Sequence, residues 1–211
     1  MIDTAALVGL NWVALRSQAQ SLLSQGNPPD LECASDWYQH EAHEVRMFAV
    51  YVLGGLAATH EQALSFLYDR CGSDPSWQAN EVLAMAFDRY CADVGYAQAL
   101  PQIGRWLVAP LPNLRRAVSE GLRPWTSSKR AYFAENPEVA IELLGRLKDD
   151  ESRYVQESAG NALRDIGRKH PELVRVAVQS WLAEFPSSVA RQVIARHALR
   201  PVSSLRPAPK A

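Results

Sequence analysis

Apolar residues recur at spacings of three and four along nearly the whole chain, while alternation with a period of two is almost absent. Spacings of three and four gather apolar side chains on one face of a helix, whereas a strand needs alternation. Turn-forming stretches such as Gly-Ser-Asp-Pro at 72–75 and Ala-Pro-Leu-Pro-Asn at 109–113 interrupt the pattern. The sequence therefore predicts an all-α fold of about ten or eleven helices in short pairs.

Five of the expected helices begin alike, with an apolar residue that is usually followed by Arg or Gln. The five starts are Val45, Trp77, Leu114, Val155 and Ala190, separated by 32, 37, 41 and 35 residues. Two helices per irregular repeat of this length are typical of HEAT-like units, which bury their apolar faces by stacking. We expect a single domain over residues 1–200, a curved α-solenoid of HEAT-like helical pairs with an N-terminal helical cap at about 1–30. The Pro-rich tail at 201–211 is expected to be disordered.

The composition limits what this domain can be. Of its 211 residues, 47% are apolar, which is enough for a sizeable core, and no apolar run approaches the roughly 18 residues of a membrane helix. Three cysteines without a CxxC spacing indicate free thiols in a reducing compartment, so we expect a cytoplasmic protein. His-Glu-Ala-His-Glu at 40–44 does not form the HExxH motif, and we expect neither a metal nor a cofactor.

One carboxylate breaks the repeat pattern. Four residues after each start the chain is apolar in four repeats, at Ala49, Val118, Ala159 and Ile194. The remaining repeat has Glu81 there, with Asn80 beside it. A desolvated carboxylate is costly unless it is paired or faces a cleft. Two interpretations stay open: an ion pair with Arg115 or Arg116 of the next repeat, or a functional carboxylate in a cleft.

The charges are distributed unevenly although the net charge is only −1. Residues 1–45 carry one cation and six acids, whereas residues 105–130 carry six cations and the single acid Glu120. A local basic surface can bind phosphate even on a neutral chain, and the alternative is a solvated helix face.

Three stretches resemble one family. These stretches are Trp-Gln-Ala-Asn-Glu at 77–81, Ser-Glu-Gly at 119–121 and the helix that begins at 154. They are similar to the HEAT-like-repeat DNA alkylation repair proteins of the AlkC/AlkD superfamily, and the resemblance extends over about residues 36–198. In both types a Trp precedes a catalytic carboxylate by four residues, and Trp77 with Glu81 matches the Glu version of the AlkC type, to which the chain looks closer. A Trp of the AlkD type is replaced here by Asn161.

The resemblance implies a DNA glycosylase that hydrolyses the N-glycosidic bond of cationic alkylated bases in double-stranded DNA and acts as a monomer, without a metal, a cofactor or a membrane. The implied catalytic residues are Glu81 and Glu120, and the implied substrate-binding residues are Trp77, Trp125 and Asn161. The expected DNA-binding residues are Arg115, Arg116, Arg123, Lys129, Arg130 and Arg153. The alternative is a non-catalytic HEAT-repeat scaffold that binds DNA or a protein partner.

Each of these residues also has a structural interpretation. Trp77 occupies an apolar start position, where packing in the core is the expected role. Glu120 lies at helical spacing from Arg116 and Arg123 and can pair with either. Asn161 can hold hydrogen bonds between repeats.

Overall fold

The computed structural model describes residues 2–25, 29–123 and 132–200. Trp125, Lys129, Arg130 and the tail at 201–211 lie outside the described residues. Within the described ranges all regular structure is helical, as two short 3₁₀-helices and twelve α-helices. The α-helices are α1 Trp12–Leu23, α2 Leu31–Tyr38, α3 His43–Leu56, α4 Glu61–Asp69, α5 Trp77–Val94, α6 Tyr96–Leu107, α7 Pro112–Gly121, α8 Tyr132–Glu135, α9 Pro137–Gly145, α10 Arg153–Gly167, α11 Pro171–Glu184 and α12 Val189–Ala198.

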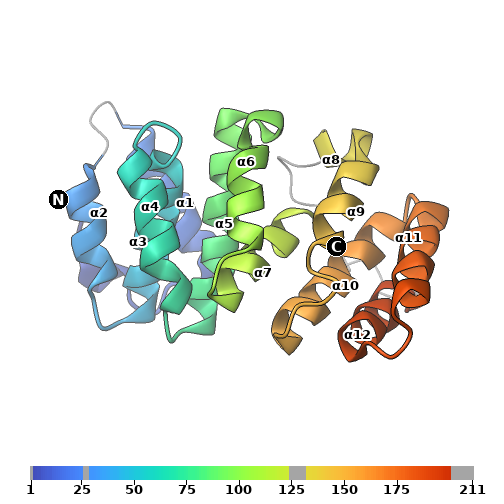
Figure 1. Cartoon of the computed structure of the whole chain (residues 1–211). Helices are drawn as coiled ribbons and strands as arrows, with labels where there is room; N and C mark the ends of the chain where they lie inside the picture. Colours follow the sequence, from blue (N-terminus) through green and yellow to red (C-terminus); the bar gives the residue numbers. More distant parts are fainter. Residues whose placement is uncertain (1, 26–28, 124–131, 201–211) are drawn as a thin grey trace, which may run out of the picture.

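The helices form two layers of a curved α-solenoid that runs from α1 and α2 at one end to α11 and α12 at the other (Figure 1). One layer, here called the site layer, consists of α1, α3, α5, α7, α10 and α12, each packed on the next. The second layer consists of α2, α4, α6, α9 and α11, which cover the first. All five helix starts expected from the sequence fall on helices of the site layer, so the predicted all-α solenoid of helical pairs is confirmed.

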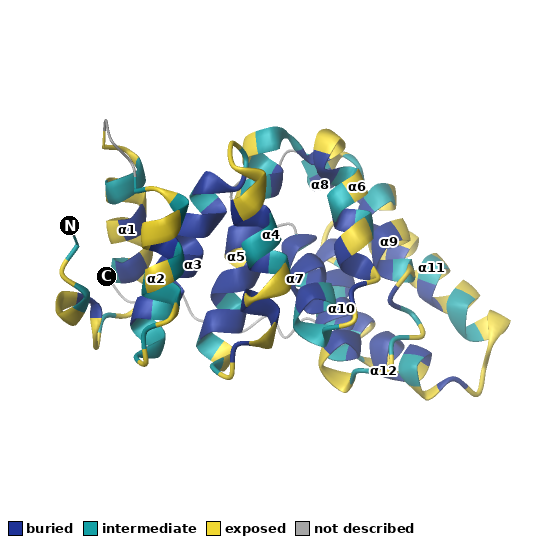
Figure 2. Cartoon of the chain, turned by 60° about the vertical axis from the view of Figure 1, so that its left-hand side comes forward, coloured by how far each residue is buried: buried dark blue, intermediate teal, exposed yellow. Residues whose placement is uncertain are grey.

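The core runs continuously between the layers along the array. Its largest fully buried side chains include Trp106, Phe48 and Phe87, and the apolar repeat positions at 49, 118, 159 and 194 are buried as expected. Figure 2 shows α3 and α5 buried over most of their lengths, while α1 and α2 at the end of the array carry exposed residues. Within the described residues, no helix is both long and apolar enough to cross a membrane.

The arginines that follow two of the repeat starts bind the turn before the next helix of the site layer. Arg46 donates from Nε to Oδ2 of Asp74 at 2.8 Å, and Arg115 donates from Nε to Oδ2 of Asp150 at 2.6 Å. Each of these aspartates also accepts from the backbone N–H two residues later. The guanidinium group of Arg115 is largely occupied, because its Nη1 also donates to the carbonyls of Ala109 and Pro110. We call this arrangement the arginine clamp.

Two helices of the site layer approach closely where a glycine allows it. A Cβ built on Gly160 of α10 would lie 2.5 Å from Cβ of His197 and 2.8 Å from the carbonyl oxygen of Ile194, both on α12. Such distances are far inside van der Waals contact, so only a residue without a side chain permits this packing. This contact fixes α12 against α10 and thereby places the last two helices of the site layer side by side.

Candidate functional site

Helix α5 begins at Trp77 and presents it to solvent. Ser76 caps the helix by accepting from the backbone N–H of Ala79, and Trp77 lies one turn before Glu81 on the same face. The Trp77 residue is 59% exposed and meets Trp12 of α1 edge-on at a centroid distance of 5.8 Å. The expectation that Trp77 packs in the core is therefore wrong, because most of the residue is exposed to solvent.

The second polar exception, Asn80, has a structural role. Its amide donates at 3.0 Å to the carbonyl oxygens of Asp74 and Ser76, and so closes the turn that precedes α5. Asn80 is buried, whereas Trp77 is exposed. The two neighbouring exceptions in the repeat pattern thus have different causes.

Glu81 forms an ion pair with Arg116 of α7. The guanidinium Nη2 donates to Oε1 of the carboxylate, and the side chains retain 23% exposure for Glu81 and 9% for Arg116. Of the two partners considered from the sequence, the structure selects Arg116, since Arg115 is held in its clamp with Asp150. The carboxylate is both paired and partly open to solvent, so it combines features of the two interpretations.

Tyr154 of α10 completes this group, and the sequence analysis missed it. Its ring lies 4.4 Å from Cζ of Arg116 in a cation–π contact, and its hydroxyl is 3.4 Å from Oε1 of Glu81. The residue is 42% exposed. Its position directly before the repeat start Val155 gave no indication of a site, because only the packing of α10 against α7 brings it to α5, 73 residues away in sequence.

The second carboxylate, Glu120, belongs to a network of its own. It accepts at 2.8 Å from Nη1 of Arg123 and at 2.7 Å from the hydroxyl of Ser158, and it lies 3.7 Å from Nη2 of Arg116. Burial raises the pKa of Glu120, but Arg123, Arg116 and the Ser158 hydroxyl outweigh it and leave the pKa below its ordinary value. Glu120 therefore pairs with Arg116 and Arg123, the two arginines considered from the sequence. Its link to Glu81 runs through Arg116.

The network continues from α7 to α10. Arg123 donates from Nε to Oδ2 of the buried Asp165 at 2.6 Å. The other oxygen of that carboxylate, Oδ1, has no hydrogen bond, and Nε of Arg164 lies 3.9 Å from it. Asn161 lies 3.5 Å from Nδ1 of His197 on α12, so it joins two repeats, while Arg153 pairs with Glu157 on its own helix.

The residues proposed for DNA binding thus fall into distinct environments. Arg115 is held in a clamp, Arg116 and Arg123 are held by carboxylates, and Arg153 is exposed. The basic stretch at 105–130 is consequently not a stripe of unpaired cations in the part of it that the structure describes. Arg115 in particular has a structural role, since Asp150 and two backbone carbonyls hold its guanidinium group, and its contact with phosphate stays a prediction.

Two other features of the sequence and the fold lie apart from this group. His40 and His43 bind locally, since Nδ1 of His40 accepts from the N–H of Ala42 and His43 lies 3.3 Å from the carboxylate of Glu44. The described residues contain no cluster of three side chains suited to a metal ion.

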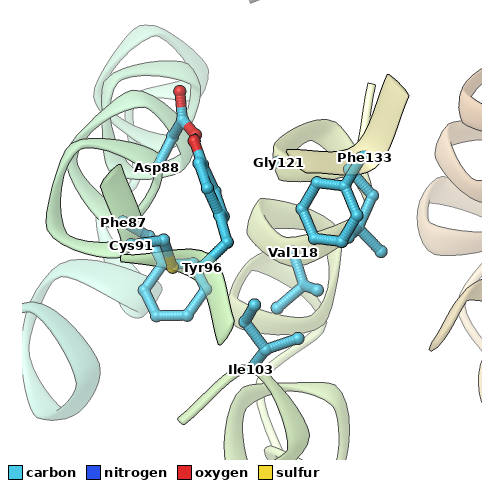
Figure 3. Close-up of a pocket in the computed structure, with 9 residues that line it drawn as sticks. Phe87, Asp88, Cys91, Tyr96, Ile103, Val118, Gly121 and Phe133 are labelled. Atoms are coloured by element: carbon cyan, nitrogen blue, oxygen red, sulfur yellow. The ribbon is translucent and has the colours of Figure 1, made fainter. Parts of the chain in front are cut away.

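A small pocket in the core lies among α5, α6, α7 and α8 (Figure 3). Its lining includes Val118, Ile103 and Phe133, and at its edge the Tyr96 hydroxyl donates to Asp88. None of the expected site residues that the structure describes is among its lining residues.

The group at Glu81 offers a partly exposed carboxylate with two exposed aromatic residues near it, Trp77 one turn earlier on α5 and Tyr154 of α10. Aromatic faces bind flat rings and cations, and a fixed carboxylate stabilises positive charge that develops next to it. The arrangement can therefore hold an exposed sugar or base and stabilise a cationic intermediate. The positive charge of Arg116 beside Glu81 opposes part of that stabilisation.

Comparisons with known proteins identify the family of the chain. Residues 1–201 match the family model of the DNA alkylation repair enzymes. AlkD2 from Streptococcus mutans is 36% identical and superposes with a TM-score of 0.82, covering 94% of each chain. The uncharacterised protein YhaZ of Bacillus subtilis (strain 168) is 34% identical over 104 residues, which are 48% of this chain and 28% of YhaZ, so the match spans less than a third of that relative.

The likeness to AlkC is weaker than the sequence motifs indicated. The alkylpurine DNA glycosylase AlkC of Pseudomonas fluorescens, bound to DNA containing an abasic site analogue, is 24% identical with a TM-score of 0.52, covering 94% of this chain and 62% of AlkC. This shows a shared fold. The expectation of a closer relation to the AlkC type is wrong, because AlkD2 is more similar in both identity and superposition.

Proposed function

The chain belongs to the DNA alkylation repair enzyme family, and from this premise we propose that it excises cationic alkylated bases from double-stranded DNA by hydrolysing the N-glycosidic bond. The observation that carries the proposal is the partly exposed carboxylate of Glu81, one helical turn after the exposed Trp77 and 3.4 Å from the hydroxyl of the exposed Tyr154. A base alkylated on a ring nitrogen is positively charged and leaves without a general acid. The protein then needs only to stabilise an oxocarbenium-like sugar and to orient a water molecule.

Glu81 is the group that performs this task in our proposal. Its carboxylate stabilises the developing charge on the sugar and accepts a proton from the attacking water, for which a gain of about 100- to 10,000-fold is ordinary. Trp77 and Tyr154 contact the sugar or the cationic base through their faces. Arg116 holds the carboxylate in place on its buried side, so that one edge remains open to solvent.

Glu120 is a positioning residue in this proposal. It contacts Arg116 at 3.7 Å and is itself held by Arg123 and Ser158, whereas the open aromatic side chains lie next to Glu81. It acts by fixing Arg116, and through Arg116 it fixes the orientation of Glu81. Asn161 lies further along α10 and contributes a hydrogen bond to His197.

One observation favours a second candidate, a non-catalytic member that binds DNA. Arg116 neutralises Glu81 and stacks on Tyr154, so the group carries its own cation at the place where a cationic base would bind. A neutralised carboxylate stabilises positive charge less well than a free one. In that case the aromatic residues recognise DNA structure and no bond is cleaved.

Release of free bases distinguishes the two candidates. Methylated duplex DNA incubated with the wild-type protein should yield free alkylated purines, and Glu81→Gln should lower the rate at least tenfold while the affinity for DNA stays within about twofold. Glu142→Gln on α9 of the second layer, an exposed glutamate paired with Arg146, is the matched control and should retain the wild-type rate. Binding of DNA without release of bases by the wild type would overturn the glycosylase proposal in favour of the second candidate.

A further inference from the structure

Helix α12 is the last helix of the site layer, and one of its faces borders an open groove. The groove lies between α11 and α12 and has a volume of about 530 Å³. Its lining consists of Leu182 of α11 and, along α12 and just beyond its end, Gln192, Ala195, Arg196, Leu199 and Arg200. The residues of α12 recur at spacings of three and four, so they form one continuous face of this helix. We call this surface the end groove.

The repeat pattern shows what this face of α12 is suited to contact. The repeat starts on α10 and α12 are 35 residues apart, so Gly160 of α10 corresponds to Ala195 of α12. By the same offset, Asn161 corresponds to Arg196. On α10 these two positions face the next helix of the site layer, because Gly160 and Asn161 both meet His197 of α12. The end groove is therefore the surface on which a further repeat would stack.

The end groove combines apolar and basic side chains. Leu199 is 47% exposed, although the terminal repeat of a soluble solenoid usually has a polar outer face. Arg196 and Arg200 are exposed and four residues apart, whereas Arg191 of the same helix is held by two carboxylates. Four helical residues rise by about 6 Å. A partner for the end groove should therefore carry two acids about 6 Å apart along a helix, with a small apolar side chain between them.

The opposite end of the array carries this pattern. Helix α2 lies at that end and packs on α3, with Ala34 buried (Figure 1). Three other residues of α2 are exposed, namely Glu32, Cys33 and Asp36. The two acids are four residues apart, like the two arginines of the end groove, and Cys33 between them is a small apolar side chain. Residues 1–45 carry six acids and one cation, whereas residues 185–200 carry three cations and no acid, so the charges of the two ends are complementary.

We propose that α2 of one copy of this chain docks in the end groove of a second copy, so that the protein associates head to tail. The two acids of α2 pair with the two arginines of the groove, and Cys33 packs near Leu199. Because the two surfaces differ, the contact is heterologous and adds copies in one direction. Exposed ion pairs are weak and screened by salt, so the association is reversible and strongest at low ionic strength. Neither surface contains Glu81, Trp77 or Tyr154, so the inference does not rest on the proposed function.

Sedimentation velocity of the full-length wild-type protein tests the association. We expect the average sedimentation coefficient to rise between about 10 and about 500 µM protein in about 20 mM salt, where charges are poorly screened. It should return to the monomer value in about 500 mM salt, because the Debye length is then only about 4 Å. A wild-type protein that stays monomeric under all these conditions would overturn the proposal and leave the end groove to residues 201–211 of its own chain or to another protein.

Charge reversal identifies the two surfaces. The variants Glu32→Lys/Asp36→Lys and Arg196→Glu/Arg200→Glu should each associate at least about tenfold more weakly than the wild type, because like charges then face each other. An equimolar mixture of the two should associate again, since each variant supplies the intact surface that the other has lost. The matched control reverses two exposed acids with the same spacing on α9 of the second layer, Glu138→Lys/Glu142→Lys, and should associate like the wild type. A mixture as monomeric as its components would overturn the head-to-tail contact.

Cross-linking gives a second measurement, which decides the question if thermal melts show that a charge-reversed variant does not fold. Cys33 is exposed, whereas Cys71 and Cys91 are buried. Leu199→Cys should therefore form disulfide-linked dimers and longer chains on mild oxidation in about 20 mM salt, and about 500 mM salt should suppress them. Val108→Cys, at an exposed apolar position after α6, is the matched control and should cross-link no more than the wild type. Equal cross-linking of the two variants would overturn the placement of Cys33 at Leu199.

Discussion

The guanidinium group of Arg116 donates to the carboxylate of Glu81, 35 residues earlier in the chain, and joins α7 to α5 at the candidate site. The same guanidinium group lies over the ring of Tyr154 on α10. Three consecutive helices of the site layer therefore meet at one cation. Because each of the three residues is oriented by the other two, substitution of any one of them should affect both stability and the site.

The charge of Glu81 should contribute to stability. Glu81→Gln leaves Arg116 underpaired, and we expect the free energy of unfolding to fall by about 1–2 kcal/mol, less than the 3–5 kcal/mol of a fully buried pair because Glu81 keeps part of its exposure. Denaturant unfolding of wild type and variant measures the difference. Glu142→Gln should change stability by at most about 0.5 kcal/mol. A variant as stable as the wild type, or more so, would show that the pair contributes nothing to folding.

Tyr154 should act through its ring more than through its hydroxyl. Tyr154→Phe keeps the cation–π contact with Arg116 and loses only a hydroxyl at the long distance of 3.4 Å from Glu81, so base release should change by less than about threefold. Tyr154→Ala removes the exposed face and should lower base release at least tenfold. Equal rates in the two variants, measured under single-turnover conditions, would argue against contact between the ring and the substrate.

The arginine clamp should matter for folding and not for DNA binding. Arg115→Gln strands the carboxylate of Asp150, which is almost fully buried, and we expect a loss of about 3 kcal/mol in the free energy of unfolding. The DNA affinity of the folded variant should stay within about twofold, since the guanidinium group is already occupied. Arg89→Gln, which breaks an exposed pair with Asp93, is the control and should cost less than about 1 kcal/mol. A large loss of affinity with unchanged stability would restore Arg115 as a phosphate contact.

The pH dependence of stability should reveal the lowered pKa of Glu120. Because its pKa is lower in the folded protein than the ordinary 4.5, the folded state binds this proton less readily than the unfolded chain. The corresponding stability is present above pH 4.5 and is lost as the pH falls through the lowered pKa. Glu120→Gln should be less stable than the wild type at pH 7 and should lose less of its stability on acidification. Melting temperatures of the two proteins that fall in parallel as the pH is lowered would contradict this assignment.

The glycine between α10 and α12 should be intolerant of a side chain. Gly160→Ala forces the two helices apart, and overpacking of this kind costs about 1–3 kcal/mol. Gly104→Ala on α6 is the matched control, because the nearest atom to its added Cβ is the mobile end of Arg146 at 3.5 Å. It should be neutral or stabilising by up to about 1 kcal/mol, from the higher helix propensity of alanine. Equal stability of the two variants, measured by thermal melts, would mean that the helix contact adjusts freely.

The all-helical class of the chain and the buried repeat positions of the site layer were determined by the sequence alone. Spacings of three and four specify a helix and its apolar face through local geometry, and Ala49, Val118, Ala159 and Ile194 are buried at the repeat position that predicts it. The same comparison singled out Glu81, because a polar residue at an otherwise apolar position is visible without coordinates. The local geometry repeated in each helical pair also explains why all five helix starts fall in one layer.

The partners of the charged side chains were decided only by the tertiary structure. Arg115 and Arg116 are adjacent in sequence and equally basic, yet one is bound in a turn to Asp150 and the other reaches Glu81, because successive residues of a helix point about 100° apart and meet different neighbours. Tyr154 becomes a neighbour of Glu81 only when α5, α7 and α10 stack. Local sequence fixes which way each helix faces, but the distances between side chains of different repeats depend on how the repeats pack, and those distances decide which charges are paired and which remain open to a ligand.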